Sequence, residues 1–167
     1  MKLTLILGIL LSFSFTGFSQ SAEHAVGIRG GYSSGFEYRF FSGEQSSYKV
    51  LLSTRREGLQ LTGLKEYHEP DIFDIGEELS LVYGLGVHVG FESWHTNAYS
   101  NVYPYPQYSV LKTGIIAGLD ALAALEYTIP TIPIVVGIED KPYFNLFGKN
   151  FFQLQPFDFA FTVKYIF

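Results

Sequence analysis

The sequence predicts an all-β fold: an eight-stranded antiparallel up-and-down barrel that crosses a membrane and has a polar interior filled by side chains. Three observations predict it. Charged residues make up only 16% of the chain, whereas hydrophobic residues make up 47% and aromatic residues 17%; soluble proteins average about 25% charged residues. Apolar residues alternate with small or polar ones along most of the chain, as they do in β-strands. The expected strands are even in number, as in single-chain membrane barrels.

The N-terminus predicts export from the cytoplasm. Lys2 precedes an uncharged, mostly apolar stretch, Leu3–Phe15, and Gly17-Phe18-Ser19 supplies small residues before a cleavage site. We therefore expect a signal peptide over residues 1–19 and one barrel domain over residues 20–167. A transmembrane anchor helix is the alternative, but the apolar stretch is short for ~30 Å of hydrocarbon.

The first four expected strands span residues 24–32, 35–43, 46–56 and 58–67. Their alternating apolar residues are, in chain order, Val26 and Ile28; Phe36, Tyr38 and Phe40; Tyr48, Val50 and Leu52; and Leu59 and Leu61. Turn residues such as Ser42-Gly43-Glu44 separate the strands. The alternation slips around Gly63–Tyr67 and leaves Lys65 facing outward, so we expect a β-bulge there.

The last four expected strands span residues 78–92, 112–129, 132–146 and 156–167. The clearest is Leu79–Phe91, with large apolar residues at every odd position and small or polar residues at most even ones. At ~3.3 Å per residue it is about 40 Å long, which suits a tilted membrane strand. Asp140 falls on the outward face, which predicts a second bulge. Between the fifth and sixth strands, Glu92–Leu111 is expected to be irregular.

The polar faces of the strands decide what the barrel encloses. They carry six bases and five acids: Arg29, Arg39, Lys49, Arg55, Lys141 and Lys164, with Glu37, Asp120, Glu126, Glu139 and Asp158. A closed interior requires such balance, because an unpaired buried charge costs several kcal/mol. A soluble β-barrel or sandwich, with its apolar face turned inward, is the alternative.

We expect these charges to form one ion-paired network across the barrel. Four of them lie on the sixth and seventh expected strands, namely Asp120, Glu126, Glu139 and Lys141. Their expected partners come from the set Arg29, Arg39 and Arg55.

Candidate catalytic and metal-binding residues are sparse. His88 and Ser80 share the inward face of one strand, but eight residues of extended chain separate them by about 26 Å. His24, His68 and His95 have no metal-ligand spacing, and the chain contains no cysteine. The sequence therefore predicts no catalytic site, no cofactor and no metal.

Aromatic residues are concentrated in the expected loop Glu92–Leu111. They are Trp94, Tyr99, Tyr103, Tyr105 and Tyr108. They can bind a surface ligand or belong to the aromatic girdle at a membrane interface, and we favour the girdle.

The signal peptide, the alternating strands and the closing segment Phe157–Phe167 resemble those of the small eight-stranded outer-membrane β-barrel proteins of Gram-negative bacteria, in the OmpA/OmpX-type class. Motifs from Gly118-Leu119-Asp120 to Glu139-Asp140-Lys141-Pro142 resemble the penultimate hairpin of a related group called "outer membrane protein β-barrel domain". The resemblance implies an outer-membrane location, contact with outer-membrane lipids and a monomeric state. It also implies that Phe167 is a recognition signal for the barrel-assembly machinery.

The leading hypothesis for function is a non-enzymatic outer-membrane barrel with a structural or surface-interaction role. A small pore, a lipid-modifying enzyme and a soluble lipocalin-like carrier are the alternatives. A net charge of −5 argues against nucleic acid as a partner, because phosphate binding needs a basic face.

Overall fold

The computed structural model describes residues 23–55, 58–72, 76–99, 107–148 and 151–167. The expected signal peptide, residues 1–19, lies outside them. Within the described ranges, no helix is both long enough and apolar enough to cross a membrane.

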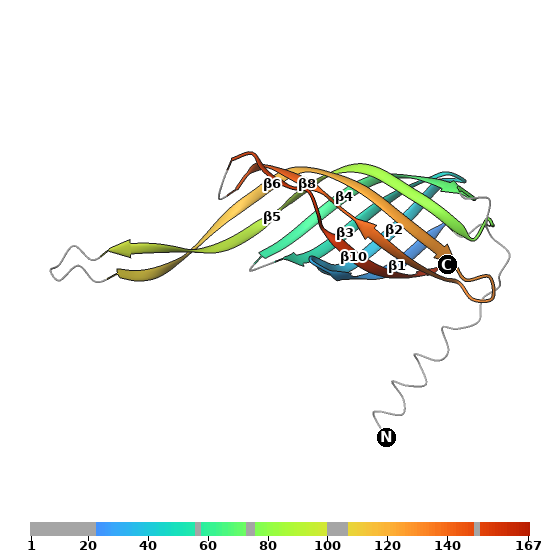
Figure 1. The fold of residues 1–167 in the computed structure, drawn as a ribbon, viewed down its shortest axis with the longest axis horizontal. Coiled ribbons are helices and arrows are strands. Elements are labelled where there is room, and N and C mark those ends of the chain that lie inside the picture. Colours follow the sequence, from blue (N-terminus) through green and yellow to red (C-terminus); the bar gives the residue numbers. More distant parts are fainter. Residues whose placement is uncertain (1–22, 56–57, 73–75, 100–106, 149–150) are drawn as a thin grey trace, which may run out of the picture.

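Ten strands form one antiparallel sheet (Figure 1). They are β1 (His24–Gly31), β2 (Ser34–Gly43), β3 (Ser46–Arg55), β4 (Gly58–Pro70), β5 (Leu79–Tyr99), β6 (Gln107–Thr128), β7 (Ile134–Asp140), β8 (Tyr143–Phe147), β9 (Gln153–Gln155) and β10 (Phe159–Ile166). Both β7 and β8 pair with β6, while β10 pairs with β7 and β9 pairs with β8. The ten strands therefore form eight strands of the barrel, because β7 and β8 together make one barrel strand and β9 and β10 together make another.

The sheet closes on itself where the first and last strands meet. β1 pairs with β10 from Ala25↔Ile166 to Gly31↔Ala160, and β5 pairs with β6 on the other side of the barrel. At the terminal end, the amide of Phe167 donates to the carbonyl of His24 over 2.9 Å, and their rings lie 5.8 Å apart. A closed eight-stranded antiparallel barrel results, as the sequence predicted.

Side chains alternate between a polar interior and an apolar exterior. Buried side chains include most of the strand charges, whereas the outward positions hold large exposed apolar groups such as Phe36, Leu85 and Ile115, each more than 70% exposed. The one cluster of buried apolar side chains is small among the described residues: Leu64, Val82, Leu122 and Ala124. The arrangement is the reverse of that in an ordinary soluble domain.

The bulge expected at Gly63–Tyr67 is wrong. β3 and β4 keep a single register from Ser46↔Tyr67 to Arg55↔Gly58, and β4 is equally regular against β5. Lys65 therefore faces outward within an uninterrupted strand. The backbone alternation is regular here, but an apolar residue, Leu64, faces the interior and a charged residue, Lys65, faces outward. The expected pattern of polar interior and apolar exterior is therefore reversed by the residue types.

The irregularity expected at Asp140 lies mainly in the partner strand. β7 and β8 keep one register against β6 from Asp140↔Ala123 to Tyr143↔Asp120. On their other side, Asp140 pairs with Phe159 but Tyr143 pairs with Gln155. The last strand therefore has one extra residue between these pairs, which is the geometry of a β-bulge. Asp140 accepts a hydrogen bond from the amide of Asp158 at this bulge, over 2.7 Å.

The irregular segment expected over Glu92–Leu111 is wrong for residues 92–99 and 107–111, because β5 and β6 remain paired as far as Tyr99↔Gln107. Residues 100–106 of that segment lie outside the described residues. β4 ends opposite Glu92, and β8 ends opposite Ala117. Beyond these points the hairpin is a free two-stranded ribbon, which extends well past the barrel on the side away from the C-terminus (Figure 1). Polar cross-strand pairs such as Ser93–Thr113, whose hydroxyls lie 2.8 Å apart, allow strand pairing here without an apolar face.

Two adjacent glycines of β1 offer a test of the closing seam between β1 and β10. A Cβ atom at Gly31 would lie 2.2 Å from the carbonyl oxygen of Phe159, whereas a Cβ at Gly30 would meet nothing within 4 Å. We predict that Gly31→Ala destabilises the barrel by about 1–3 kcal/mol, the usual range for overpacking. Gly30→Ala should leave stability unchanged or slightly raised. Urea unfolding midpoints of the two variants measure the difference, and equal midpoints would contradict this seam geometry.

Candidate functional site: the ion-paired interior

Each of the eight barrel strands places at least one ionisable side chain in the interior. The buried members, each at most 4% exposed, are Arg29, Glu37, Arg39, Lys49, Glu66, His88, Asp120, Glu126, Glu139, Lys141, Asp158 and Lys164. Period-two alternation is the reason, because every one of these residues lies at an inward position of its strand.

Lys49 lies at the centre of this set. Its ammonium nitrogen is 3.0 Å from a carboxylate oxygen of Glu139, 3.1 Å from Glu66 and 3.4 Å from Glu37. These acids come from β7, β4 and β2, so one lysine on β3 joins strands on opposite sides of the barrel. The Lys49 side chain is fully buried.

Toward the end of the barrel that carries the termini, Arg39 and Lys164 share one acid. The Arg39 guanidinium donates two hydrogen bonds to Glu126, over 2.7 and 2.8 Å, and it also lies 2.7 Å from Glu66. Lys164 donates to the same Glu126 over 2.9 Å and lies 3.0 Å from Glu37. Two-pronged arginine–carboxylate pairs are among the strongest polar contacts in proteins.

Toward the opposite end, Arg29 and Lys141 share Asp158. Arg29 lies 2.5 Å from Glu139 and 3.3 Å from Asp158, and it also donates to the carbonyl and hydroxyl oxygens of Ser33. Lys141 lies 2.9 Å from Asp120 and 3.6 Å from Asp158.

All these pairs belong to one network because several acids have two partners. Glu139 links Lys49 to Arg29, and Glu66 links Lys49 to Arg39. A continuous series of contacts therefore leads from His88 beside Asp120 at one end to Lys164 at the other.

The network contains ten of the interior charges predicted from sequence. Arg55, also predicted to face the interior, is half-buried, and its guanidinium carbon lies 3.9 Å from the centre of the Tyr143 ring. The sequence analysis missed Glu66, because a register slip was expected there. Uninterrupted alternation would have placed it inside. With Glu66 the acids number six, which matches the six bases.

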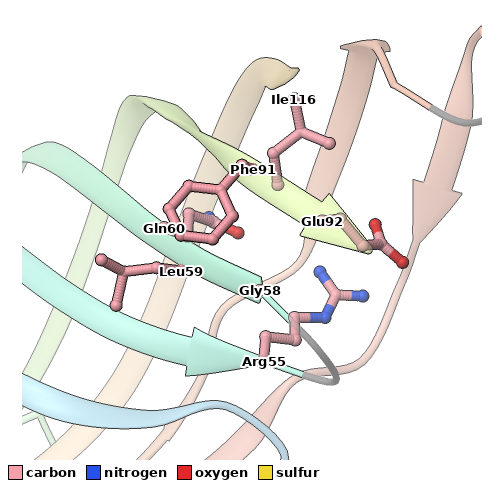
Figure 2. Close-up of a pocket in the computed structure, with 7 residues that line it drawn as sticks. All are labelled: Arg55, Gly58, Leu59, Gln60, Phe91, Glu92 and Ile116. Carbon is pink, nitrogen blue, oxygen red and sulfur yellow. The ribbon is translucent and has the colours of Figure 1, made fainter. Parts of the chain in front are cut away.

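Arg55 lies at the end of the barrel farther from the termini, beside residues of β4, β5 and β6 (Figure 2). A cavity of about 10 Å³ remains there, lined by Arg55, Gly58, Leu59, Gln60, Phe91, Glu92 and Ile116. That volume holds about one water molecule. Nearby, the buried hydroxyls of Ser53 and Tyr143 have no hydrogen-bond partner among the described residues.

His88 is held by two polar neighbours. One ring nitrogen lies 2.6 Å from Asp120, and the other lies 2.9 Å from the amide oxygen of Asn145. Ser80 lies far along the same strand, where it pairs with Glu126, whereas His88 pairs with Gly118. The structure therefore does not bring the Ser80 hydroxyl to the imidazole as nucleophilic catalysis by this pair requires.

The other histidines lie apart. His24 bonds to Tyr38, His68 to Ser47 and His95 to Ser109. In the ranges that the structure describes, no group of three or more His, Cys, Asp or Glu residues could hold a metal ion.

Of the aromatic residues expected in a loop, Trp94, Tyr99 and Tyr108 belong instead to the strands of the projecting ribbon. The Trp94 ring lies over Gly114, where an added Cβ would come within 2.8 Å of it. Tyr103 and Tyr105, and the side chains of Tyr99 and Tyr108, lie outside the described part of the molecule.

Comparisons with known proteins bear on the fold. No protein-family model matches the sequence, and no curated protein sequence matches it. Among solved structures, the N-terminal β-barrel domain of Pseudomonas aeruginosa OprF is similar, with a TM-score of 0.54 and 12% sequence identity over 89% of this chain and 100% of that domain. The resemblance to small eight-stranded barrels is therefore confirmed for the fold.

The contacts of Glu126 predict that its removal is costly. Glu126→Ala leaves Arg39 and Lys164 buried without their shared acid, and breaking a buried pair costs of order 3–5 kcal/mol. We expect Glu126→Ala to lower the urea unfolding midpoint far more than Leu125→Ile, its outward-facing neighbour on β6. A neutral Glu126→Ala together with a tolerated charge at Leu125 would reverse the assignment of inside and outside.

Proposed function

We propose that the chain is a non-enzymatic, monomeric protein of the outer membrane, with a structural or surface-interaction role and a sealed barrel. One observation carries this proposal: charges are paired inside the barrel, and large apolar side chains are exposed on its outside. In water, an apolar surface of this extent is an aggregation hazard. In lipid, it is the outward-facing apolar band of a membrane barrel.

Tyrosines support an orientation for the barrel in the membrane. Six exposed tyrosines point outward from the strands: Tyr38, Tyr48, Tyr67, Tyr83, Tyr127 and Tyr165. Most lie near the strand ends on the side of the termini. Because tyrosine is enriched at membrane interfaces, we assign this ring to the periplasmic interface. The projecting β5–β6 ribbon then lies on the extracellular side, where membrane barrels have their long connections.

Filling of the interior argues against a pore. An eight-stranded barrel is just wide enough for side chains to fill it. Here Lys49, Glu66 and Glu139 meet at the centre with no exposed side-chain surface. A soluble carrier of the lipocalin type would instead enclose an apolar cavity.

The surface-interaction role rests on the ribbon. Beyond Glu92 and Ala117 none of the described strands pairs with its outer edges, and it stands clear of the barrel (Figure 1). Phe167, 55% exposed at the closing seam, is available as the proposed signal for the barrel-assembly machinery.

Membrane fractionation tests the location. We expect the mature protein in the outer-membrane fraction, soluble only with detergent, and migrating differently on gels before and after boiling because a closed barrel resists cold detergent. Recovery in the aqueous fraction without detergent would support the soluble carrier instead.

Planar-bilayer recording tests the sealed interior. We expect no conductance above the leak of the bilayer from the purified protein, because Lys49, Glu66 and Glu139 meet at the centre of the barrel with no exposed side-chain surface. Glu139→Ala, which removes the acid shared by Arg29 and Lys49, is the variant in which leak is most expected. Stable unit conductance in the unaltered protein would favour a pore.

A further inference from the structure

One basic side chain departs from the rule that charges face inward. Of the lysines and arginines in the described strands, Lys65 alone lies at an outward position of the barrel wall. Its ammonium nitrogen is 4.1 Å from the ring centre of Tyr48 and 5.7 Å from that of Tyr67. It also donates to the hydroxyl of Ser42 over 3.3 Å.

These contacts place the Lys65 ammonium near the rim, at the level of the Ser42 hydroxyl. Ser42 is the second-last residue of β2, and its hydroxyl lies 2.9 Å from that of Ser46 across the turn between β2 and β3. The side chain therefore extends toward the end of the barrel, as long basic side chains do in membranes. A lysine costs ~2–4 kcal/mol at the bilayer midplane but only ~0–1 near the interface.

Acidic groups lie beyond Lys65, nearer the aqueous end. Glu69 follows on the same outward face of β4 and accepts a hydrogen bond from the Tyr83 hydroxyl over 3.0 Å. Glu44, in the adjacent turn, lines a surface hollow together with Gly43, Gln45, Ser46 and Tyr67. Within the described residues, the contacts of the Lys65 ammonium are with the Ser42 hydroxyl and the rings of Tyr48 and Tyr67 rather than with these acids.

We propose that this rim patch, defined as Lys65, Ser42, Ser46, Glu44 and Glu69, binds the phosphoethanolamine headgroup of a bilayer phospholipid. The phosphate would contact the Lys65 ammonium and the serine hydroxyls, and the lipid ammonium would contact the Glu44 or Glu69 carboxylate. The inference rests on the proposed membrane location.

The order of charges selects this headgroup. In a phospholipid the phosphate lies nearer the acyl chains and the terminal ammonium nearer water. The protein has its cation deeper and its acids nearer the rim, which is the complementary order. An anionic phosphatidylglycerol headgroup would use Lys65 but would meet the acids unfavourably. A choline headgroup has no N–H group to donate to a carboxylate.

Native mass spectrometry of the purified full mature chain in detergent micelles tests the proposal. The probe is an equimolar mixture of phosphatidylethanolamine, phosphatidylglycerol and phosphatidylcholine. We expect phosphatidylethanolamine to be retained preferentially, and Lys65→Met to reduce its retention by about tenfold, a loss of one charge-assisted contact. Lys112→Met, on the ribbon beyond the barrel, is the matched control and should retain the lipid.

The Glu69→Gln variant tests recognition of the lipid ammonium separately from recognition of the phosphate. It should keep phosphate binding through Lys65 but reduce the preference for phosphatidylethanolamine over phosphatidylcholine. Equal retention of all three lipids, preference for phosphatidylglycerol, or unchanged retention by Lys65→Met would each overturn the proposal. Every variant is first checked for the boiling-dependent gel shift, so a failure of the barrel or its location is distinguished from a failure of the rim patch.

Discussion

Compensation of buried charge is the constraint on which the rest of the structure depends. A barrel of eight strands has an interior too narrow for bulk water, so each charge there needs a protein partner. Lys49 meets this requirement with three acids from three other strands. Because partners are shared in this way, the position of one strand in the ring is tied to the positions of several others, including strands that it does not pair with.

The bulge in the last strand connects this network to the backbone. Asp158, at the bulge, accepts hydrogen bonds from the amide and hydroxyl of Ser33, over 3.0 and 2.7 Å, and also contacts Arg29. Its own amide donates to Asp140. The irregular register between β9 and β10 therefore brings a carboxylate to the turn after β1, next to the seam where the barrel closes. The extra residue of the bulge thus positions the Asp158 carboxylate, and redirecting a side chain in this way is a common role of β-bulges.

Much of this fold follows from the sequence, because alternation with period two reveals both the strands and their inward residues. Arg29, Glu37, Arg39 and Lys49 could be assigned to the interior from parity alone. Glu66 was missed although the same parity places it inside, because its neighbours Leu64 and Lys65 reverse the expected polarity of the two faces and suggested a register slip. The position of the β-bulge was also missed. The outward position of Asp140 indicated an irregularity in its own strand, but the extra residue lies in the neighbouring last strand. Pairing between specific acids and bases depends on side-chain reach across the lumen, which sequence spacing does not contain.

The ribbon formed by the end of β5 and the start of β6 lies outside the region where buried charge must be compensated. Inside the barrel, even positions of β5 hold glycines, His88 and other residues that fit a crowded polar interior. Beyond Glu92 the same parity carries Trp94, whose ring lies over Gly114 of the opposite strand. Cross-strand hydrogen bonds such as His95–Ser109 maintain the pairing there. The need to pair buried charges therefore constrains the inward residues of the barrel wall, whereas the ribbon beyond Glu92 and Ala117 carries none of the ion-paired residues of the network.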